Sequence, residues 1–255
     1  MKHKLSSAAI LLATIVTTLF ASAGPASAAL PPGVTIYQPA YSDNIYPVLD
    51  GVTYDPLTYD EWASFGFPTP RSIASVYVKY SWAPTIYAIT SFPDGPLQES
   101  IGLEGWLRAG APGPRTVGFI EGTHFYRWVT SPELFAFTED DGISHKLSFI
   151  EWVASGYQTP ETSTSQGFFR LSWSSSPGIV YQDLADDTVE PLTLENWVDE
   201  DYPTPLGVPR LTGDAFYTFN GSPDIFYAGP TLDETVITLD EWIAAGSPAP
   251  ELRAS

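Results

Sequence analysis

The sequence predicts a mainly β fold with short helices, built from five β-β-β-α repeats. One phrase carries the prediction because it returns five times with a tryptophan at its centre. The copies read "LTYDEWASFGFPTP" from Leu57, "IGLEGWLRAGAPGP" from Ile101, "LSFIEWVASGYQTP" from Leu147, "LTLENWVDEDYPTP" from Leu192 and "ITLDEWIAAGSPAP" from Ile237. Their tryptophans are Trp62, Trp106, Trp152, Trp197 and Trp242, at spacings of 44, 46, 45 and 45 residues. Such a period is typical of supersecondary units that pack on their neighbours.

Ahead of the phrases, aromatic and β-branched residues predict two long strands joined by a turn. The first strand reads "VYVKY" from Val76, "HFYRW" from His124, "FFRLSW" from Phe168 and "AFYTF" from Ala215. A turn with Ala-Pro or Ser-Pro follows, and a second strand such as "ELFAF" comes next. An acidic or glycine-containing turn then leads into a short third strand, for example "ISHKL" from Ile143.

The phrase itself predicts a short helix with a defined start. With Ser148 at the N-cap, Glu151 falls at the third helical position and completes a capping box. Leu147 and Trp152 then form the hydrophobic staple around that cap. The same register gives capping boxes at Thr58 with Glu61 and at Thr238 with Glu241. The fourth copy, capped by Thr193, has Asn196 in place of the glutamate, and the second has Gly102 and Gly105, so both lack the box.

Each predicted helix also has a defined end. Gly66, Gly110, Gly156 and Gly246 stand where a positive φ is needed, and Asp201 takes that place in the fourth copy. The proline-rich tail then prevents further helix. A helix of about two turns is marginal alone, so packing of its tryptophan must stabilise it. We therefore interpret the five phrase tryptophans as structural anchors of the repeat.

About 45 residues cannot bury a stable core alone, so neighbouring repeats must complete each other. The terminal repeats resemble the middle ones, which favours closure into a five-bladed propeller-like toroid. An open β-β-α array is the alternative. Residues 29–255 are expected to form a single repeat domain, with units at roughly 34–75, 76–117, 118–166, 167–214 and 215–255.

The N-terminus and the composition point to export. Residues 1–28 resemble a secretory signal peptide, with Lys2 and Lys4, an apolar stretch and "ASA" at 26–28. Loss of this leader takes the formal charge from -19 to -21, which disfavours nucleic acid and anionic membrane surfaces as partners. The chain contains no cysteine, so disulfides and thiolate chemistry are excluded. We expect a secreted or extracellular protein that can associate with a cell wall and that does not insert into a membrane.

Motifs for catalysis are missing from the sequence. After the leader, only His124 and His145 are available, and neither stands in a metal-ligand spacing. The phrase glutamates are better explained as caps than as catalytic acids. We therefore predict no enzyme, no cofactor and no metal centre. Weak calcium binding in the acidic turns stays open; these turns are 139–141, 183–187 and 199–201.

Aromatic residues outside the phrase are the best candidates for binding a ligand. Trp128 and Trp173 recur four residues before a proline at the end of a first strand. Trp82 lies outside that register, at the turn between two strands. We interpret Trp82, Trp128 and Trp173 as candidate stacking residues, with packing in the core as the alternative.

The pattern "YRW…SPELFAF…GISHKLSFIEWVASGYQTP" resembles the tandem tryptophan-containing repeats of secreted actinobacterial cell-wall hydrolases, including N-acetylmuramoyl-alanine amidases. The resemblance covers residues 29–255 and is weakest in the second repeat. Those repeats accompany catalytic domains, which implies a binding or spacer role at the cell envelope. We therefore expect a non-enzymatic protein that binds cell-wall or extracellular glycan. A glycan hydrolase with central carboxylates and a structural or protein-interaction module are the alternatives, and the oligomeric state is not predicted.

Overall fold

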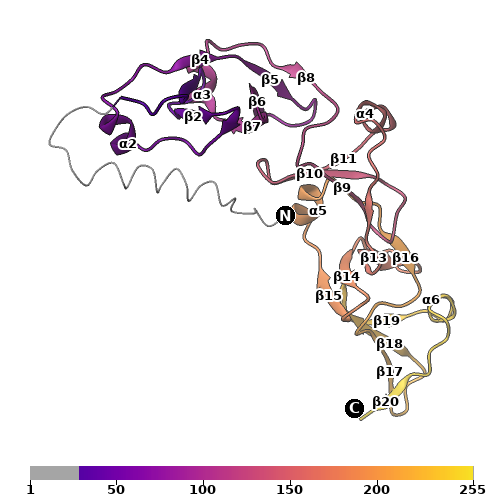
Figure 1. The fold of residues 1–255 in the computed structure, drawn as a ribbon. Helices are drawn as coiled ribbons and strands as arrows, with labels where there is room; N and C mark the ends of the chain where they lie inside the picture. The colour runs from indigo at the N-terminus through magenta and orange to yellow at the C-terminus, as the bar shows by residue number, and fades with distance from the viewer. Residues whose placement is uncertain (1–28, 255) are drawn as a thin grey trace. The chain divides into compact units, whose positions relative to one another are not determined.

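The computed structural model describes residues 29–254, so the predicted signal peptide lies outside the described residues. These residues form five four-stranded sheets and five helices of six residues each, which confirms the mainly β class and the repeated architecture (Figure 1). The chain divides into two compact units, residues 1–117 and 118–255, which are described separately below.

The first unit contains two sheets. One consists of β1 (Thr35–Pro39), β2 (Tyr46–Leu49), β3 (Val52–Thr53) and β4 (Arg71–Ile73), with helix α2 (Tyr59–Ser64) between β3 and β4. The other consists of β5 (Ser75–Lys79), β6 (Ile86–Phe92), β7 (Gly95–Ile101) and β8 (Arg115–Thr116), with α3 (Leu103–Arg108) before β8. A small core joins the two sheets through Tyr46, Val48 and Phe92.

The second unit contains three sheets of the same design. The first has β9 (His124–Arg127), β10 (Phe135–Thr138), β11 (Ile143–Lys146), α4 (Phe149–Ala154) and β12 (Glu161–Thr162). The second has β13 (Gln166–Leu171), β14 (Val180–Asp183), β15 (Thr188–Pro191), α5 (Leu194–Asp199) and β16 (Leu206–Val208). The third has β17 (Ala215–Phe219), β18 (Ile225–Gly229), β19 (Leu232–Ile237), α6 (Leu239–Ala244) and β20 (Glu251–Arg253).

Every sheet contains a fourth strand that the sequence did not predict. The strand after the helix pairs in parallel with the first strand, as Tyr37 opposite Arg71 and Phe169 opposite Leu206 illustrate. The order in each sheet is therefore third, second, first and fourth. The added strand has only two or three residues and lies at a sheet edge, so it carries too few residues to show an alternating pattern. The proline-rich tail is thus followed directly by a strand.

The predicted helix starts are confirmed. Thr58, Ser148 and Thr238 each form a complete capping box with the glutamate three residues later. Thr193 accepts a hydrogen bond from the backbone N–H of Asn196, and Gly102 provides no side-chain cap. Because none of the helix residues is fully buried, the tryptophans are half-buried rather than deep in a core.

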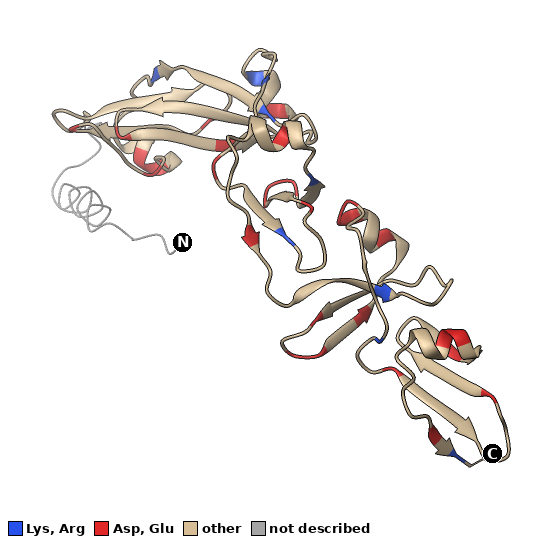
Figure 2. Ribbon diagram, turned by 90° about the vertical axis from the view of Figure 1, so that its right-hand side faces the viewer, with Lys and Arg blue, Asp and Glu red and all other residues tan. Residues whose placement is uncertain are grey.

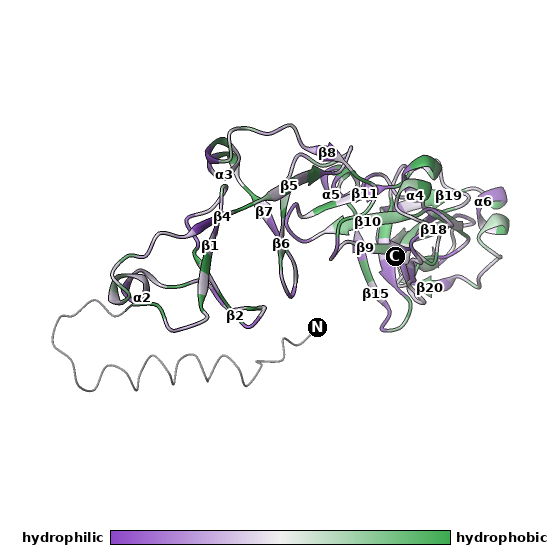
Figure 3. Cartoon of the chain, turned by 45° about the horizontal axis from the view of Figure 1, so that its top comes forward, coloured by the Kyte–Doolittle hydropathy of each residue, from purple (hydrophilic) through white to green (hydrophobic). Residues whose placement is uncertain are grey.

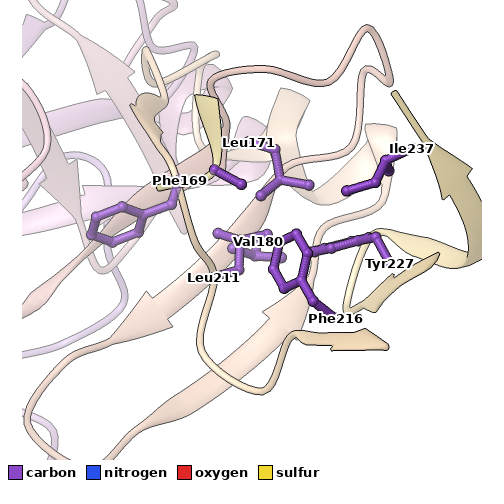
Figure 4. Close-up of a cluster of buried hydrophobic side chains, with 8 residues drawn as sticks. Phe169, Leu171, Val180, Leu211, Phe216, Tyr227 and Ile237 are labelled. Carbon is purple, nitrogen blue, oxygen red and sulfur yellow. The ribbon is translucent and has the colours of Figure 1, made fainter. Parts of the chain in front are cut away.

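An apolar core of eight buried residues lies between the last two sheets (Figure 4). It combines Phe169, Leu171 and Val180 from one sheet with Phe216 and Tyr227 from the next. Ile237 belongs to the same cluster and Trp242 packs against it, so both members of the predicted staple in the last repeat reach this core.

Candidate functional site

The phrase tryptophans make the same hydrogen bond in all five repeats. Each indole Nε1 donates to the backbone carbonyl six residues later, at 2.9 to 3.0 Å. The acceptors are Pro68, Pro112, Gln158, Pro203 and Pro248. This bond holds the segment that follows the helix against the helix. Five identical bonds to the protein's own backbone are the contacts of a structural anchor.

The helix ends are more unusual than the sequence indicated. Gly66 has a positive φ as predicted, and so does Phe67 after it, at φ 55°. Phe67 N–H donates to the carbonyl of Trp62 at 3.1 Å, which completes a Schellman motif, and its ring packs edge-on against that tryptophan. The other four repeats also have two successive residues with positive φ and the matching backbone bond. The backbone bond to the tryptophan carbonyl is common to all five, and in the first, third and fourth repeats an aromatic ring of the second residue also packs on the tryptophan, which offsets the strain.

Trp128 and Trp173 lie at joints between sheets. Trp128 packs edge-on against Phe168 and Tyr181 of the next sheet. Trp173 makes the equivalent contact with Tyr227, and its Nε1 donates to the Pro209 carbonyl at 2.9 Å. Both rings are only partly exposed. Their geometry therefore explains a packing role without a ligand.

Trp82 is placed differently. Its ring stacks on buried Tyr80, with centroids 4.6 Å apart and an interplanar angle of 14°. This stacking engages one face of the Trp82 ring within the repeat, and the residue is otherwise partly exposed. Trp82 belongs to the first unit, whereas Trp128 and Trp173 belong to the second and lie at different joints within it.

The second repeat departs from the phrase for a steric reason. A Cβ atom at Gly105 would lie 2.9 Å from the backbone oxygen of Tyr41 in the first repeat. A glutamate at this third helical position would collide with that neighbour. The missing capping box is therefore the consequence of close packing between α3 and the first repeat. At Gly102, by contrast, a Cβ would meet nothing within 4 Å.

Three adjoining hollows surround α3, and together they form what we call the α3 groove. A hollow of about 260 Å³ is lined by Pro84, Ile86, Leu103 and Trp106. It shares Ile101 and Gly102 with a hollow of about 440 Å³, whose polar lining includes Glu99, Ser100 and Glu104. The second in turn shares Ser42, Asp43 and Arg108 with a third hollow of about 280 Å³. The α3 groove is thus apolar and aromatic at one end and polar elsewhere.

The carboxylates of the α3 groove are held by protein contacts. Tyr41 and Tyr46 donate their hydroxyl groups to Glu99, at 2.5 and 3.2 Å. Burial, reinforced by the negative charge of Glu99, raises the pKa of Tyr41, so this tyrosine stays a donor. Arg108 pairs with Asp43 and with Glu104, the latter at 3.3 Å. Each of the three carboxylates in the groove therefore already has a hydrogen-bond or ion-pair partner within the chain.

A second polar cluster lies in the second unit, around β11. His145 lies 3.2 Å from Glu151 through Nε2 and 3.2 Å from Asp201 through Nδ1. Burial acts to raise the pKa of Glu151, but hydrogen bonds from the N–H and hydroxyl of Ser148, together with His145, bring it below its ordinary value. Because Asp201 belongs to the following repeat, these contacts join the two repeats.

Two further findings concern residues 29–254. Within this range, no group of three or more His, Asp or Glu side chains is arranged to hold a metal ion. The acidic turns considered for calcium show no such arrangement. No helix in the same range is long and apolar enough to span a membrane.

Sequence reasoning did not identify the α3 groove. No motif in the sequence distinguishes Glu99, Glu104 and Arg108, and Tyr41 is 58 residues away from its partner Glu99. One available signal was the degenerate phrase of the second repeat, since glycine replaces the cap and the glutamate only there. Comparison of the chain with protein-family models, with curated proteins and with solved structures finds no match.

Proposed function

We propose that this protein is an exported, non-enzymatic repeat protein that binds a cell-wall or extracellular glycan in the α3 groove. The observation that supports it is the run of three adjoining hollows around α3. A linear polymer needs neighbouring subsites, and three hollows in series provide them. The resemblance to repeats of secreted cell-wall hydrolases is consistent with this role and with location at the cell envelope.

The chemistry of the lining suits a sugar. Pyranose rings have apolar faces that pack on aromatic side chains and hydroxyl groups that bind carboxylates, serines and guanidinium groups. Trp106 and Leu103 supply the apolar surface at one end. Ser42, Ser100 and Glu104 supply polar groups further along. Polar groups of this kind fix the orientation of a ligand, while the apolar end of the groove adds buried contact area.

Glycan hydrolysis is the second candidate function because three carboxylates line the groove. A hydrolase needs one carboxyl group to donate a proton and a second to act as nucleophile or base. Glu99 is occupied by two tyrosine hydroxyls, whereas Asp43 and Glu104 both pair with Arg108. These contacts favour binding over catalysis. Incubation with a chromogenic chitin substrate should release no product above background.

We further propose that the five repeats close into a five-bladed propeller-like toroid, with an open array as the alternative. Five sheets of one topology, each with an exposed short edge strand, support this proposal. Small-angle X-ray scattering tests it directly, since a ring and an open array of equal mass differ in radius of gyration. A maximum dimension typical of an extended array would contradict closure.

Gly102→Phe is the variant that tests binding. Gly102 lines two of the hollows, has φ −75° and leaves room for a side chain, so phenylalanine should fill the α3 groove without backbone strain. In sedimentation with insoluble peptidoglycan and chitin, we expect wild type to be retained and Gly102→Phe to lose at least about tenfold in affinity. Gly113→Phe is the matched control, since Gly113 also meets nothing within 4 Å and lies outside the groove.

Two results would contradict the proposal. Absence of wild-type retention on either polymer would remove the glycan role. Equal retention of wild type and Gly102→Phe would show that glycan binds elsewhere, and Trp82, Trp128 and Trp173 would then be the next residues to replace.

A further inference from the structure

The five short helices share an exposed apolar face. The first and fifth helical residues lie one turn apart on the same side of each helix. These pairs, which we call the helix strips, are Tyr59 with Ala63, Leu103 with Leu107, Phe149 with Val153, Leu194 with Val198 and Leu239 with Ile243. In α6, Leu239 is 63 % exposed and Ile243 55 %, and in α5 Leu194 is 71 % exposed. Figure 3 shows hydrophobic and hydrophilic segments together on α6.

The helix strips are not required by the fold of the repeat. The anchoring contact is made by the tryptophan at the fourth helical position, which reaches the repeat and is half-buried. The side chains at the first and fifth positions, by contrast, are largely exposed, although Tyr59 and Phe149 also contact an aromatic ring of their own repeat. An exposed apolar side chain at a single surface site needs no explanation, but the same choice in successive repeats does.

The charge around four of the five strips is negative, and α3, with Glu104 in its first turn and Arg108 in its last, is the exception. The first turns of α2 and α6 carry Asp60 with Glu61 and Asp240 with Glu241. The first turns of α4 and α5 contribute Glu151 and Glu195, and the last turns of α2, α4, α5 and α6 contain no basic residue. Figure 2 shows this excess of acidic residues on the short helices. A cation at a helix C-terminus would stabilise it, so the absence of basic residues at four ends leaves that position open.

We propose that the helix strips are docking sites for a basic, amphipathic protein segment that presents apolar side chains beside lysine or arginine. Charge decides between occupants. A second copy of this chain would bring one acidic helix against another, which electrostatic repulsion disfavours. A basic segment gains both burial of the apolar pair and attraction to the acidic first turn. Aliphatic pairs such as Leu239 with Ile243 lack the flat ring that stacks on sugars. The strip of α3 shares Leu103 with the α3 groove, whereas the strips of α5 and α6, which the test below changes, contain none of the groove's lining residues.

Repetition makes a weak contact useful. One helix of two turns buries little area, and each contact alone is expected to be weak. A segment, or an assembly of segments, that engages α5 and α6 together gains from effective concentration without any new contact. The proposal therefore requires the loss of binding to be greater when two strips are changed than when one is.

The test uses a synthetic 18-residue amphipathic peptide of leucine and lysine and the full chain. Fluorescence anisotropy at physiological salt should show binding by wild type. The variant Leu194→Ser/Val198→Ser/Leu239→Ser/Ile243→Ser should bind at least about tenfold more weakly. Val236→Ser/Leu252→Ser is the matched control, because these residues are 55 % and 70 % exposed on β19 and β20, outside the helices. This control should bind like wild type.

Three outcomes would overturn the proposal. Equal binding by the helix and control variants would show general attraction to an acidic protein. Equal binding of a peptide with glutamate in place of lysine would remove the charge argument. Sedimentation showing a wild-type dimer that the helix variant abolishes would assign the strips to a second copy. Asp240→Asn/Glu195→Gln, which keeps every apolar residue, should weaken binding and lower its salt dependence.

Discussion

The two joints of the second unit solve the same packing problem by different means. Each contains a tryptophan, Trp128 or Trp173, that packs edge-on against a tyrosine from the second strand of the next sheet. Beyond that common contact, the joint between the β17–β20 sheet and the sheet before it is apolar, with Leu171, Val180 and Phe216 in one buried cluster.

The preceding joint, which connects the β9–β12 and β13–β16 sheets, is polar. Asp201 accepts the Lys146 N–H at 2.7 Å, and Glu133 accepts the N–H and the hydroxyl of Thr204, both at 2.8 Å. The polar joint depends on residues that break the repeat, since Asp201 occupies a position that is glycine in the other four copies. Its φ of 55° is strained for a residue with a side chain, and these bonds offset the strain. A departure from a repeat thus indicates a contact with the neighbouring repeat.

The largest expected effect is at the apolar joint. Leu171→Ala removes a side chain that is 3 % exposed and leaves a cavity between the two sheets, which should lower the free energy of unfolding by about 3 kcal/mol. Urea denaturation followed by tryptophan fluorescence measures the change. Leu206→Ala is the control, because Leu206 lies exposed on edge strand β16 and its loss should cost less than about 1 kcal/mol. Similar losses for both variants would mean that this joint is not a cooperative core.

A smaller effect is expected at the polar joint. Glu133→Ala removes the acceptor of the Thr204 N–H and one of the two acceptors of the Lys146 ammonium, which also donates to the Tyr202 carbonyl. This loss should cost about 1 kcal/mol at neutral pH. Urea denaturation at several pH values provides the measurement. Glu139→Ala is the matched control, since Glu139 is highly exposed and its carboxylate lies 3.9 Å from His124.

The cost of Glu133→Ala should depend on pH. Burial acts to raise the pKa of Glu133, but bonds from Thr204 and Lys146 outweigh it and bring that pKa below its ordinary value. The stabilisation by Glu133 is therefore complete when the pH is above the pKa of this glutamate in the unfolded chain, about 4.3. It is lost as the pH falls through the lower pKa of the folded chain. A difference between wild type and variant that stays constant down to pH 2 would contradict the ionic role of Glu133.

The helix boundaries could be predicted because their causes are local. Thr58 finds its capping partner three residues away, and Gly66 adopts a positive φ without strain because it lacks a Cβ atom. The second residue of positive φ, such as Phe67, could not be predicted, because its conformation is held by a backbone bond to the tryptophan carbonyl, and in Phe67 also by ring packing, rather than by its own preference. The fourth strand was missed for a related reason, since its pairing partner lies in the first strand of the repeat.

The α3 groove could not be predicted because it depends on contacts between repeats. Its polar hollow forms where Tyr41 meets Glu99 and where Asp43 meets Arg108, and each of these pairs joins the first repeat to the second. The degenerate phrase marks the place, but only the position of the Tyr41 carbonyl explains why Gly105 has no side chain. Differences between repeats therefore located the contacts, and the structure was needed to show what they enclose.

The smallest predicted effect concerns Glu200, which lies in the polar joint but destabilises the folded chain when it is ionised. Burial raises the pKa of this carboxyl group, whereas the hydroxyl of Ser144, which donates to it at 3.1 Å, only partly compensates. The folded chain therefore binds this proton more tightly than the unfolded chain. The free energy of unfolding should consequently fall as the pH rises from the pKa of Glu200 in the unfolded chain, about 4.3, through its raised pKa in the folded chain. Above that pH it should level off.

Glu200→Gln keeps an acceptor for Ser144 and removes the charge from its half-buried site. We expect this variant to be more stable than wild type at pH 7, by less than about 1 kcal/mol, and to match it below pH 4. Thermal unfolding across this pH range measures both. Asp199→Asn provides the comparison, since Asp199 is the exposed neighbour and its negative charge also raises the pKa of Glu200. A Glu200→Gln variant less stable than wild type at pH 7 would mean that the joint requires the charge, as it does at Glu133, and the contrast between these two glutamates would then disappear.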